Sequence, residues 1–234
     1  MRNAAFTLVQ NDMVILELWL KYYSKYFDDL YVIGNGTRED YKELDKLKEK
    51  YDFEFERVPL VHSSEYTLPI CKDKQVKLLE DHHWVLYSDC DEFIVADPKK
   101  YRDLKAFMEA YPGEKCYCEG FNVLQMEDEQ PISFAFKYLK QRKYFAKDLS
   151  YNKCLLSRVP LNWNVGCHKE IDIPDDISKA KADTGLFLLH LKYADLNYIK
   201  PRDLGPITTG LHHGVIAEGM KTKQEIPEEI RRLF

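Results

Sequence analysis

Two aspartates one residue apart, Asp89 and Asp91, directly follow the apolar run Trp84–Tyr87. In open α/β sheets, ligands bind in the crevice beyond the carboxyl ends of the strands. Carboxylates that meet at such a strand end can share one hard cation, and Mg²⁺ and Mn²⁺ also bind phosphate oxygens. The pair therefore predicts a Mn²⁺ or Mg²⁺ site that holds a phosphorylated substrate. An acidic turn exposed to solvent is the simpler alternative for so short a motif.

The segments that must position this pair alternate between strand and helix patterns. Apolar or alternating runs predict strands at Ala5–Gln10, Leu30–Ile33, Phe53–Phe55, Trp84–Tyr87 and Phe93–Val95. Apolar residues at helical spacing predict helices over Leu16–Phe27, Tyr41–Tyr51, Lys72–Asp81 and Leu104–Tyr111. This alternation indicates an α/β fold with a mainly parallel sheet covered by helices. Beyond residue 113 the pattern predicts a smaller strand-and-loop part, with Gly185–Leu191 as its clearest strand.

The composition is that of an ordinary globular protein and argues against binding to nucleic acid. Of 234 residues, 45% are hydrophobic and 31% are charged, which does not indicate disorder. The formal net charge is −5, whereas binding to a phosphate backbone requires a basic surface.

Nothing in the sequence predicts a membrane span or a secretory signal. The apolar run Gly185–Leu191 is far too short to cross a bilayer, and Met1–Gln10 is better interpreted as a first strand. The cysteines form no C-x-x-C pair and are expected to be reduced thiols: Cys71, Cys90, Cys116, Cys118, Cys154 and Cys167. We therefore expect a cytoplasmic protein.

Three short segments occur in an order and spacing that resemble a known enzyme group. They are Val9–Asp12 with the following Ile15–Tyr23, then Leu30–Thr37, then Trp84–Ile94. They are similar to the K-N-E with its E-W-L-x-Y-H helix, the I-Y-D-N-G-S turn and the W-x-x-x-x-D-x-D-E-F signature of GT-A fold glycosyltransferases. The likeness is to family 2 and its family 92-like relatives, and it is strong over residues 5–95.

This resemblance implies a Rossmann-like GT-A domain over residues 1–234, with a nucleotide-sugar-binding half at 1–113 and an acceptor-side half and tail at 114–234. It implies that Asp12 contacts the nucleoside and that Asn35 lies near it. Asp89 and Asp91 take the metal and diphosphate positions, and Asp91 is the expected catalytic residue. Gly34 departs from the family, which has an aspartate there.

The resemblance also implies a histidine ligand from late in the domain, and two candidates exist. His190 ends the apolar run Gly185–Leu189 and is the preferred ligand, because a strand holds a side chain precisely. His168 lies in the loop-like segment Gly166–Glu170. For each, a structural role without metal is the alternative.

Other residues are predicted to contact the substrates. Gln75 is a candidate for a sugar or nucleotide contact, and Lys153 and Arg158 are cations that could balance phosphate charge. Surface charges are an equally good interpretation of the last two. The basic, aromatic stretch Lys137–Lys147 could contact an anionic acceptor or the inner face of a membrane, although an exposed hairpin is favoured.

The expected reaction is transfer of a sugar from a nucleoside-diphosphate sugar to an acceptor hydroxyl, and the resemblance implies bacterial surface-glycan or lipid-linked glycan synthesis. An inverting enzyme needs a general base, for which Glu170 and Asp195 are candidates. One alternative is a non-catalytic nucleotide-sugar binding protein. Another is a sugar-phosphate nucleotidyltransferase, although Gln10–Met13 lacks the glycine-rich phosphate loop expected after the first strand.

Overall fold

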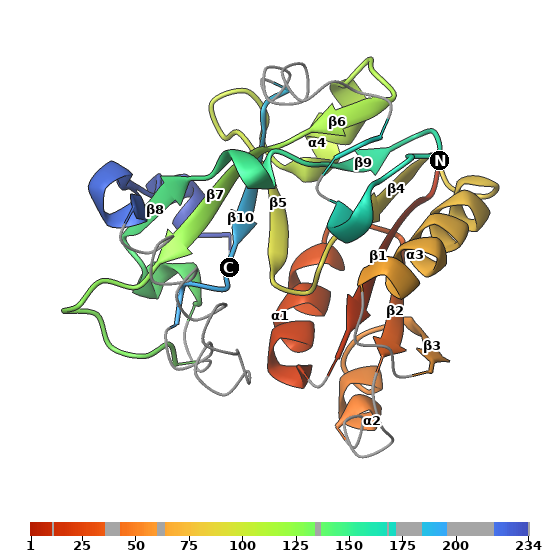
Figure 1. Ribbon diagram of the computed structural model, residues 1–234, viewed down its shortest axis with the longest axis horizontal. Helices are drawn as coiled ribbons and strands as arrows, with labels where there is room; N and C mark the ends of the chain where they lie inside the picture. Colours follow the sequence, from red (N-terminus) through yellow and green to blue (C-terminus); the bar gives the residue numbers. More distant parts are fainter. Residues whose placement is uncertain are drawn as a thin grey trace.

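The computed structural model describes residues 1–10, 12–35, 43–59, 64–133, 137–167, 169–171, 184–195 and 218–233. The chain forms two β-sheets that meet side by side, with helices packed against them (Figure 1). It is an α/β protein, as the alternation of strand and helix patterns predicts.

The first sheet has six strands and is mainly parallel. Its order is β3 (Glu54–Val58), β2 (Asp29–Asn35), β1 (Asn3–Val9), β4 (Trp84–Tyr87), β9 (Cys154–Ser157) and β6 (Lys115–Tyr117). The strands β3, β2, β1 and β4 run parallel, whereas β9 is antiparallel to both of its neighbours. The carboxyl ends of the four parallel strands therefore share one edge, as the sequence predicts.

The second sheet has five strands and contains most of the predicted strand-and-loop part. Its order is β11 (Gln224–Glu225), β8 (Tyr144–Lys147), β7 (Glu119–Leu124), β10 (Leu186–His190) and β5 (Glu92–Ala96). The strand β5 directly follows β4 but belongs to the other sheet. The turn that carries Asp89 and Asp91 thus crosses from one sheet to the other, an arrangement that the sequence does not predict.

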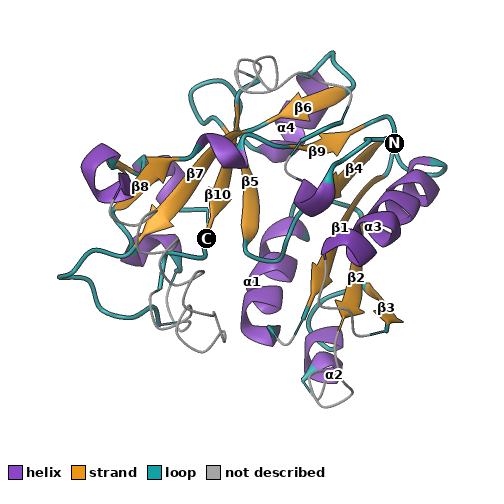
Figure 2. Ribbon diagram, in the orientation of Figure 1, coloured by secondary structure: helices purple, strands orange, loops and turns teal. Residues whose placement is uncertain are grey.

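The predicted helices are present with some changes in length (Figure 2). They are α1 (Met13–Tyr23), α2 (Leu44–Lys48), α3 (Ser64–Leu79), α4 (Leu104–Ala110) and, near the C-terminus, α8 (Glu228–Arg231). Short 3-10 helices are η2 (Leu139–Gln141), η3 (Leu149–Tyr151) and η4 (Val165–Cys167). The third helix begins at Ser64 rather than Lys72, and it includes Pro69.

Helix α1 holds the crossing between the two sheets in place. The indole of Trp19 donates to Ser88 Oγ at 2.9 Å, and the hydroxyl of Tyr22 donates to the Ile94 carbonyl at 2.9 Å. The hydroxyl of Tyr23 accepts from the Ile94 amide at 2.8 Å. These three aromatic side chains are almost completely buried. The helix thus packs on the residues on both sides of the Asp89–Asp91 turn, and a rigid element supports the turn.

Two further predictions concern the whole chain. In the part of the chain that the structure describes, no helix is both long and apolar enough to cross a membrane. All six cysteines lie within the described residues, where they are buried and form no disulfide.

Candidate functional site

The turn between β4 and β5 presents two carboxylates that differ in their surroundings. The Asp89 carboxylate is half-buried and accepts a hydrogen bond from the hydroxyl of Tyr87 at 2.7 Å. The Asp91 side chain is buried, and its backbone carbonyl accepts from the Leu191 amide at 2.8 Å. That bond ties the turn to the end of β10, the strand that carries His190.

The pairing of β10 with β5 brings His190 beside Asp91. The two strands run antiparallel with His190 opposite Glu92, so the imidazole lies next to the preceding aspartate. Its Nε2 lies 3.7 Å from Asp91 Oδ2. Burial and then the charges of Lys153 and Lys192 lower the pKa of His190 well below its ordinary value. The imidazole is therefore neutral at pH 7, which is the form that binds metal ions.

The Asp91 and His190 side chains fit a divalent cation. Ligand atoms each about 2.1 Å from one ion can lie up to about 4.2 Å apart, so a separation of 3.7 Å is compatible with shared coordination. A carboxylate with an imidazole suits Mn²⁺ better than Mg²⁺, which favours oxygen ligands alone. Among the described residues, no group of three or more His, Cys, Asp and Glu side chains is placed to hold a metal. Asp89 lies at the same turn, where its carboxylate accepts from Tyr87, without completing such a group.

Two other predicted site residues are described only in part or not at all. His168, the alternative metal ligand, lies outside the described residues. Asn35 is the last residue of β2, and its backbone pairs with Val58 of β3 at the same sheet edge. The structure describes no side-chain contact for Asn35, so its role near a nucleoside stays a prediction.

Asp12 lies between β1 and α1, at the edge where the parallel strands end. Its backbone carbonyl accepts from the Leu16 amide at 2.9 Å, but within the described residues its side chain makes no capping hydrogen bond to α1. Burial is the largest cause that raises the pKa of Tyr138. The charges of Asp195, Asp91 and Asp12 raise it further, whereas the charge of Arg142 opposes the rise. Tyr138 is therefore within electrostatic reach of all three carboxylates, which fits a shared site.

Replacing Asp12 with Asn is expected to weaken nucleotide binding without destabilising the protein. If the carboxylate accepts a hydrogen bond from a nucleoside, the loss of affinity should be about 1–3 kcal/mol, measured by calorimetry. Asp103 is the matched control, because its side chain does cap α4 by accepting from the Ala106 amide at 2.8 Å. Asp103→Ala should cost about 1 kcal/mol of stability, and Asp12→Ala less. Unchanged nucleotide affinity in a folded Asp12→Asn variant would remove Asp12 from the site.

Lys153 was predicted to balance phosphate charge, but the structure pairs it with Glu92. The ammonium lies 2.5 Å from Glu92 Oε1, and both side chains are only 2% exposed. Burial raises the pKa of Glu92 to about 7, and the nearby Lys153 charge opposes that rise. The Lys153 ammonium, buried against the Glu92 carboxylate, supports the β4–β5 turn from inside the fold. The predicted contact of Lys153 with a phosphate stays a prediction.

Gln75 and Arg158 also have structural partners. The Gln75 side chain is fully buried, where its amide donates to Ser157 Oγ at 3.0 Å and accepts from the Leu161 amide at 2.9 Å. The guanidinium of Arg158 stacks on Trp84, 4.5 Å from the ring centre. These bonds give Gln75 a packing role between α3 and the end of β9, and its sugar or nucleotide contact stays a prediction.

Glu170 was predicted as a general base, but both of its carboxylate oxygens have protein donors. Lys115 Nζ donates to Oε1 and the hydroxyl of Tyr117 donates to Oε2, each at 2.5 Å. The side chain is 3% exposed. A carboxylate held in this way is poorly placed to take a proton from an acceptor hydroxyl. Asp195, the other candidate, accepts from the Ile132 amide at 2.7 Å and lies near Tyr138.

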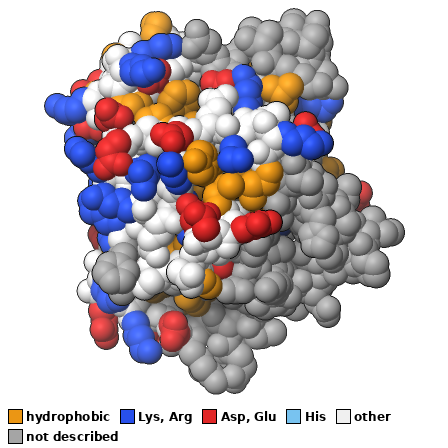
Figure 3. Space-filling view, turned by 90° about the vertical axis from the view of Figure 1, so that its left-hand side faces the viewer, with side chains coloured by type: hydrophobic (Ala, Val, Ile, Leu, Met, Phe, Trp, Pro, Cys, Tyr) orange, Lys and Arg blue, Asp and Glu red, His pale blue; other side chains and the backbone are white. Residues whose placement is uncertain are grey.

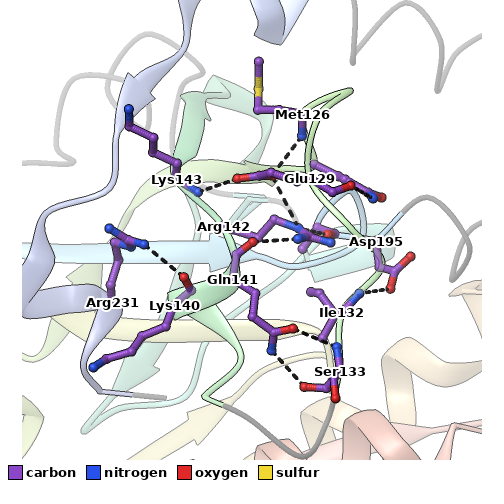
Figure 4. A network of polar contacts seen from close by, with 12 residues as sticks. Met126, Glu129, Ile132, Ser133, Lys140, Gln141, Arg142, Lys143, Asp195 and Arg231 are labelled. Carbon is purple, nitrogen blue, oxygen red and sulfur yellow. Dashed lines mark hydrogen bonds and ion pairs between the residues drawn. The ribbon is translucent and has the colours of Figure 1, made fainter.

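Asp195 lies at one side of a network of polar contacts, which it joins by accepting from Ile132 (Figure 4). Gln141 both donates to and accepts from the backbone of Ser133, each at 2.8 Å. The carboxylate of Glu129 accepts from the Met126 amide at 2.9 Å and from the Lys143 amide at 3.0 Å. These bonds hold the backbone on both sides of Ile132, whose amide donates to Asp195. No local sequence pattern predicts the contact of Asp195 with this network, because Ile132 lies 63 residues away in the chain.

The basic stretch Lys137–Lys147 is largely matched by nearby acceptors. Lys143 pairs with Glu225 at 3.2 Å, and Lys147 pairs with Glu119. Figure 3 views the molecule from the side of β8 and α8, where basic and acidic side chains are interspersed with apolar ones. The predicted contact with a membrane or an anionic acceptor gains no support from this charge distribution.

Comparisons with known proteins leave the family open. No protein-family model and no curated protein matches the chain. A solved structure of 4-diphosphocytidyl-2C-methyl-D-erythritol synthase from Anaerococcus prevotii is 14% identical over 56% of this chain, with a TM-score of 0.32. A mannose-1-phosphate geranyltransferase from Thermus thermophilus is 11% identical over 93%, with a TM-score of 0.35. The matches span 59% and 65% of those two chains. Similarity at this level does not indicate an activity.

Proposed function

We propose that this protein transfers a sugar from a nucleoside-diphosphate sugar to an acceptor hydroxyl in a metal-dependent reaction. The observation that carries the proposal is the approach of His190 Nε2 to Asp91 Oδ2, 3.7 Å apart where the turn between β4 and β5 meets the end of β10. These are the residues at which the resemblance to GT-A glycosyltransferases implies a metal. The resemblance further supports a glycan or lipid-linked acceptor.

Asp91 and His190 would hold the ion, and Asp89 would add negative charge beside it. When bound, a divalent cation neutralises the charge that develops on the diphosphate leaving group. Asp12 and Asn35 would bind the nucleoside from the ends of β1 and β2. The buried pair of Glu92 and Lys153 would keep the turn rigid, since a site works best when its ligands are held by packed elements.

Asp195 is the better candidate for the general base. Its Oδ2 accepts from the Ile132 amide, which orients the carboxylate, and the charges of Asp195 and Asp91 both raise the pKa of Tyr138, after burial as the largest cause. In an inverting transfer this carboxylate would take the proton of the acceptor hydroxyl as the hydroxyl attacks the sugar. Glu170 is less suitable because Lys115 and Tyr117 occupy its two oxygens.

Metal dependence of nucleotide binding tests the proposal. Calorimetry with UDP and with GDP should give clear binding in Mn²⁺ and a loss of at least about 100-fold, or about 3 kcal/mol, in EDTA. The expectation follows because Asp89 and Asp91 would repel a diphosphate in the absence of a cation. Equal affinity in Mn²⁺ and in EDTA would refute the metal role. Metal-dependent binding without any turnover would favour the non-catalytic alternative.

A further inference from the structure

The orientation of the Asn122 amide can be deduced from its neighbours. One end of the amide lies 2.8 Å from Asp148 Oδ2, and the other lies 2.8 Å from His190 Nδ1. The Asp148 carboxylate also accepts from the amide and the hydroxyl of Ser150. An ionised carboxylate only accepts hydrogen bonds, so the NH₂ group of Asn122 must face Asp148. Its carbonyl oxygen therefore faces His190.

This orientation fixes the proton on the imidazole. The carbonyl oxygen of Asn122 cannot donate, so His190 Nδ1 must carry the hydrogen that joins them. In the neutral ring Nε2 then carries a lone pair, and it faces Asp91 Oδ2 at 3.7 Å. Two acceptors that face each other across this distance repel each other, and a cation bound between them would stabilise both.

The plane of the imidazole ring is fixed as well. The ring of Tyr151 stacks on His190 with 4.1 Å between centres and 25° between planes. The ammonium of Lys153 lies 5.0 Å from the centre of the Tyr151 ring. Two contacts thus hold the ring. One comes from Asn122 on β7, the strand that pairs with β10, and the other comes from Tyr151 in η3.

We propose that Asn122 and Asp148 are positioning residues that keep His190 in the Nδ1–H tautomer, so that Nε2 is presented with Asp91 to a divalent cation. Partners of this kind orient metal-binding histidines, and their loss weakens metal affinity by about 10–100-fold. The metal part rests on the proposed function, whereas the tautomer part does not depend on it.

The tautomer is tested on the metal-free protein by NMR with ¹⁵N-labelled histidine. We expect the neutral His190 ring to carry its proton on Nδ1 in the wild type. Asn122→Ala should lose this preference, because the acceptor is gone. The double variant Asn122→Asp with Asp148→Asn exchanges the two side chains and keeps an acceptor at Nδ1, so it should restore the Nδ1–H form. A proton on Nε2 in the folded wild type would overturn the tautomer assignment.

The presentation of Nε2 is tested by calorimetric titration of Mn²⁺ into the protein with UDP. Asn122→Ala should bind Mn²⁺ about 10–100-fold more weakly, and the exchange variant should recover most of that loss. If Asn122→Ala changes the tautomer but not the Mn²⁺ affinity, the positioning role is wrong. If the wild type binds no Mn²⁺, the proposed function and the metal part fail together, while the NMR result still decides the tautomer.

Discussion

Replacing Asp91 with Asn is expected to lower turnover by about 10²–10³-fold or more while leaving the fold intact, the range found when one fixed electrostatic group is removed from an active site. The substitution keeps the size of the side chain and removes the negative charge that faces His190. It should act on the reaction, because the ion then binds weakly and the diphosphate leaves without charge neutralisation. The measurement is the rate of nucleoside-diphosphate release at one fixed Mn²⁺ concentration, chosen to saturate the wild-type protein.

Asp52→Asn is the matched control for this variant. Asp52 is an exposed carboxylate just before β3, at the opposite edge of the same sheet. It should leave both the rate and the requirement for Mn²⁺ unchanged. Equal activity of Asp91→Asn and wild type, with both variants folded, would contradict the role of Asp91 as a metal ligand.

Replacing Lys153 with Met is expected to lower the free energy of unfolding by about 3–5 kcal/mol, the range for breaking a buried ion pair. The loss arises because Glu92 would lose its partner, 2.5 Å away in the native protein, and its buried carboxyl would have to take up a proton or stay charged without that contact. The Met side chain fills a similar volume, so packing contributes little to the change. Urea denaturation of the two proteins measures the difference.

A double variant separates the buried charge from other causes. Lys153→Met with Glu92→Gln removes both charges and should recover much of the stability that the single variant loses. The exposed pair of Lys50 and Glu17 is the control, since Lys50→Met should leave stability nearly unchanged. A single variant as stable as wild type, or a double variant no better than the single one, would show that the pair does not support the turn.

Local patterns predicted the elements whose causes are local. The apolar run Trp84–Tyr87 became β4, and Leu104–Tyr111 became α4 because Asp103 caps its first turn and Phe107 packs inward. The strand pattern of Gly185–Leu191 likewise became β10 with His190 at its end. In each case the residues that determine the helix or strand are close neighbours in the sequence, so a local pattern is enough to predict it.

Long-range pairing explains what the sequence did not predict. The run Glu92–Ala96 is buried on both faces, so its pattern cannot tell which sheet it joins. Lys153 resembles any surface cation in the sequence, because its partner Glu92 lies 61 residues away. Asn122 carries no motif at all, and its contact with His190 spans 68 residues. Such roles depend on strand pairing, which periodicity does not encode.

The product released by the wild-type protein tests the central claim most directly. The protein would be incubated in Mn²⁺ with a panel of nucleoside-diphosphate sugars, and separately with nucleoside triphosphates and sugar 1-phosphates. The account predicts release of a nucleoside diphosphate from at least one sugar donor, abolished by EDTA and by Asp91→Asn. Release of pyrophosphate from a nucleoside triphosphate, with no nucleoside diphosphate from any donor, would contradict it and identify a nucleotidyltransferase.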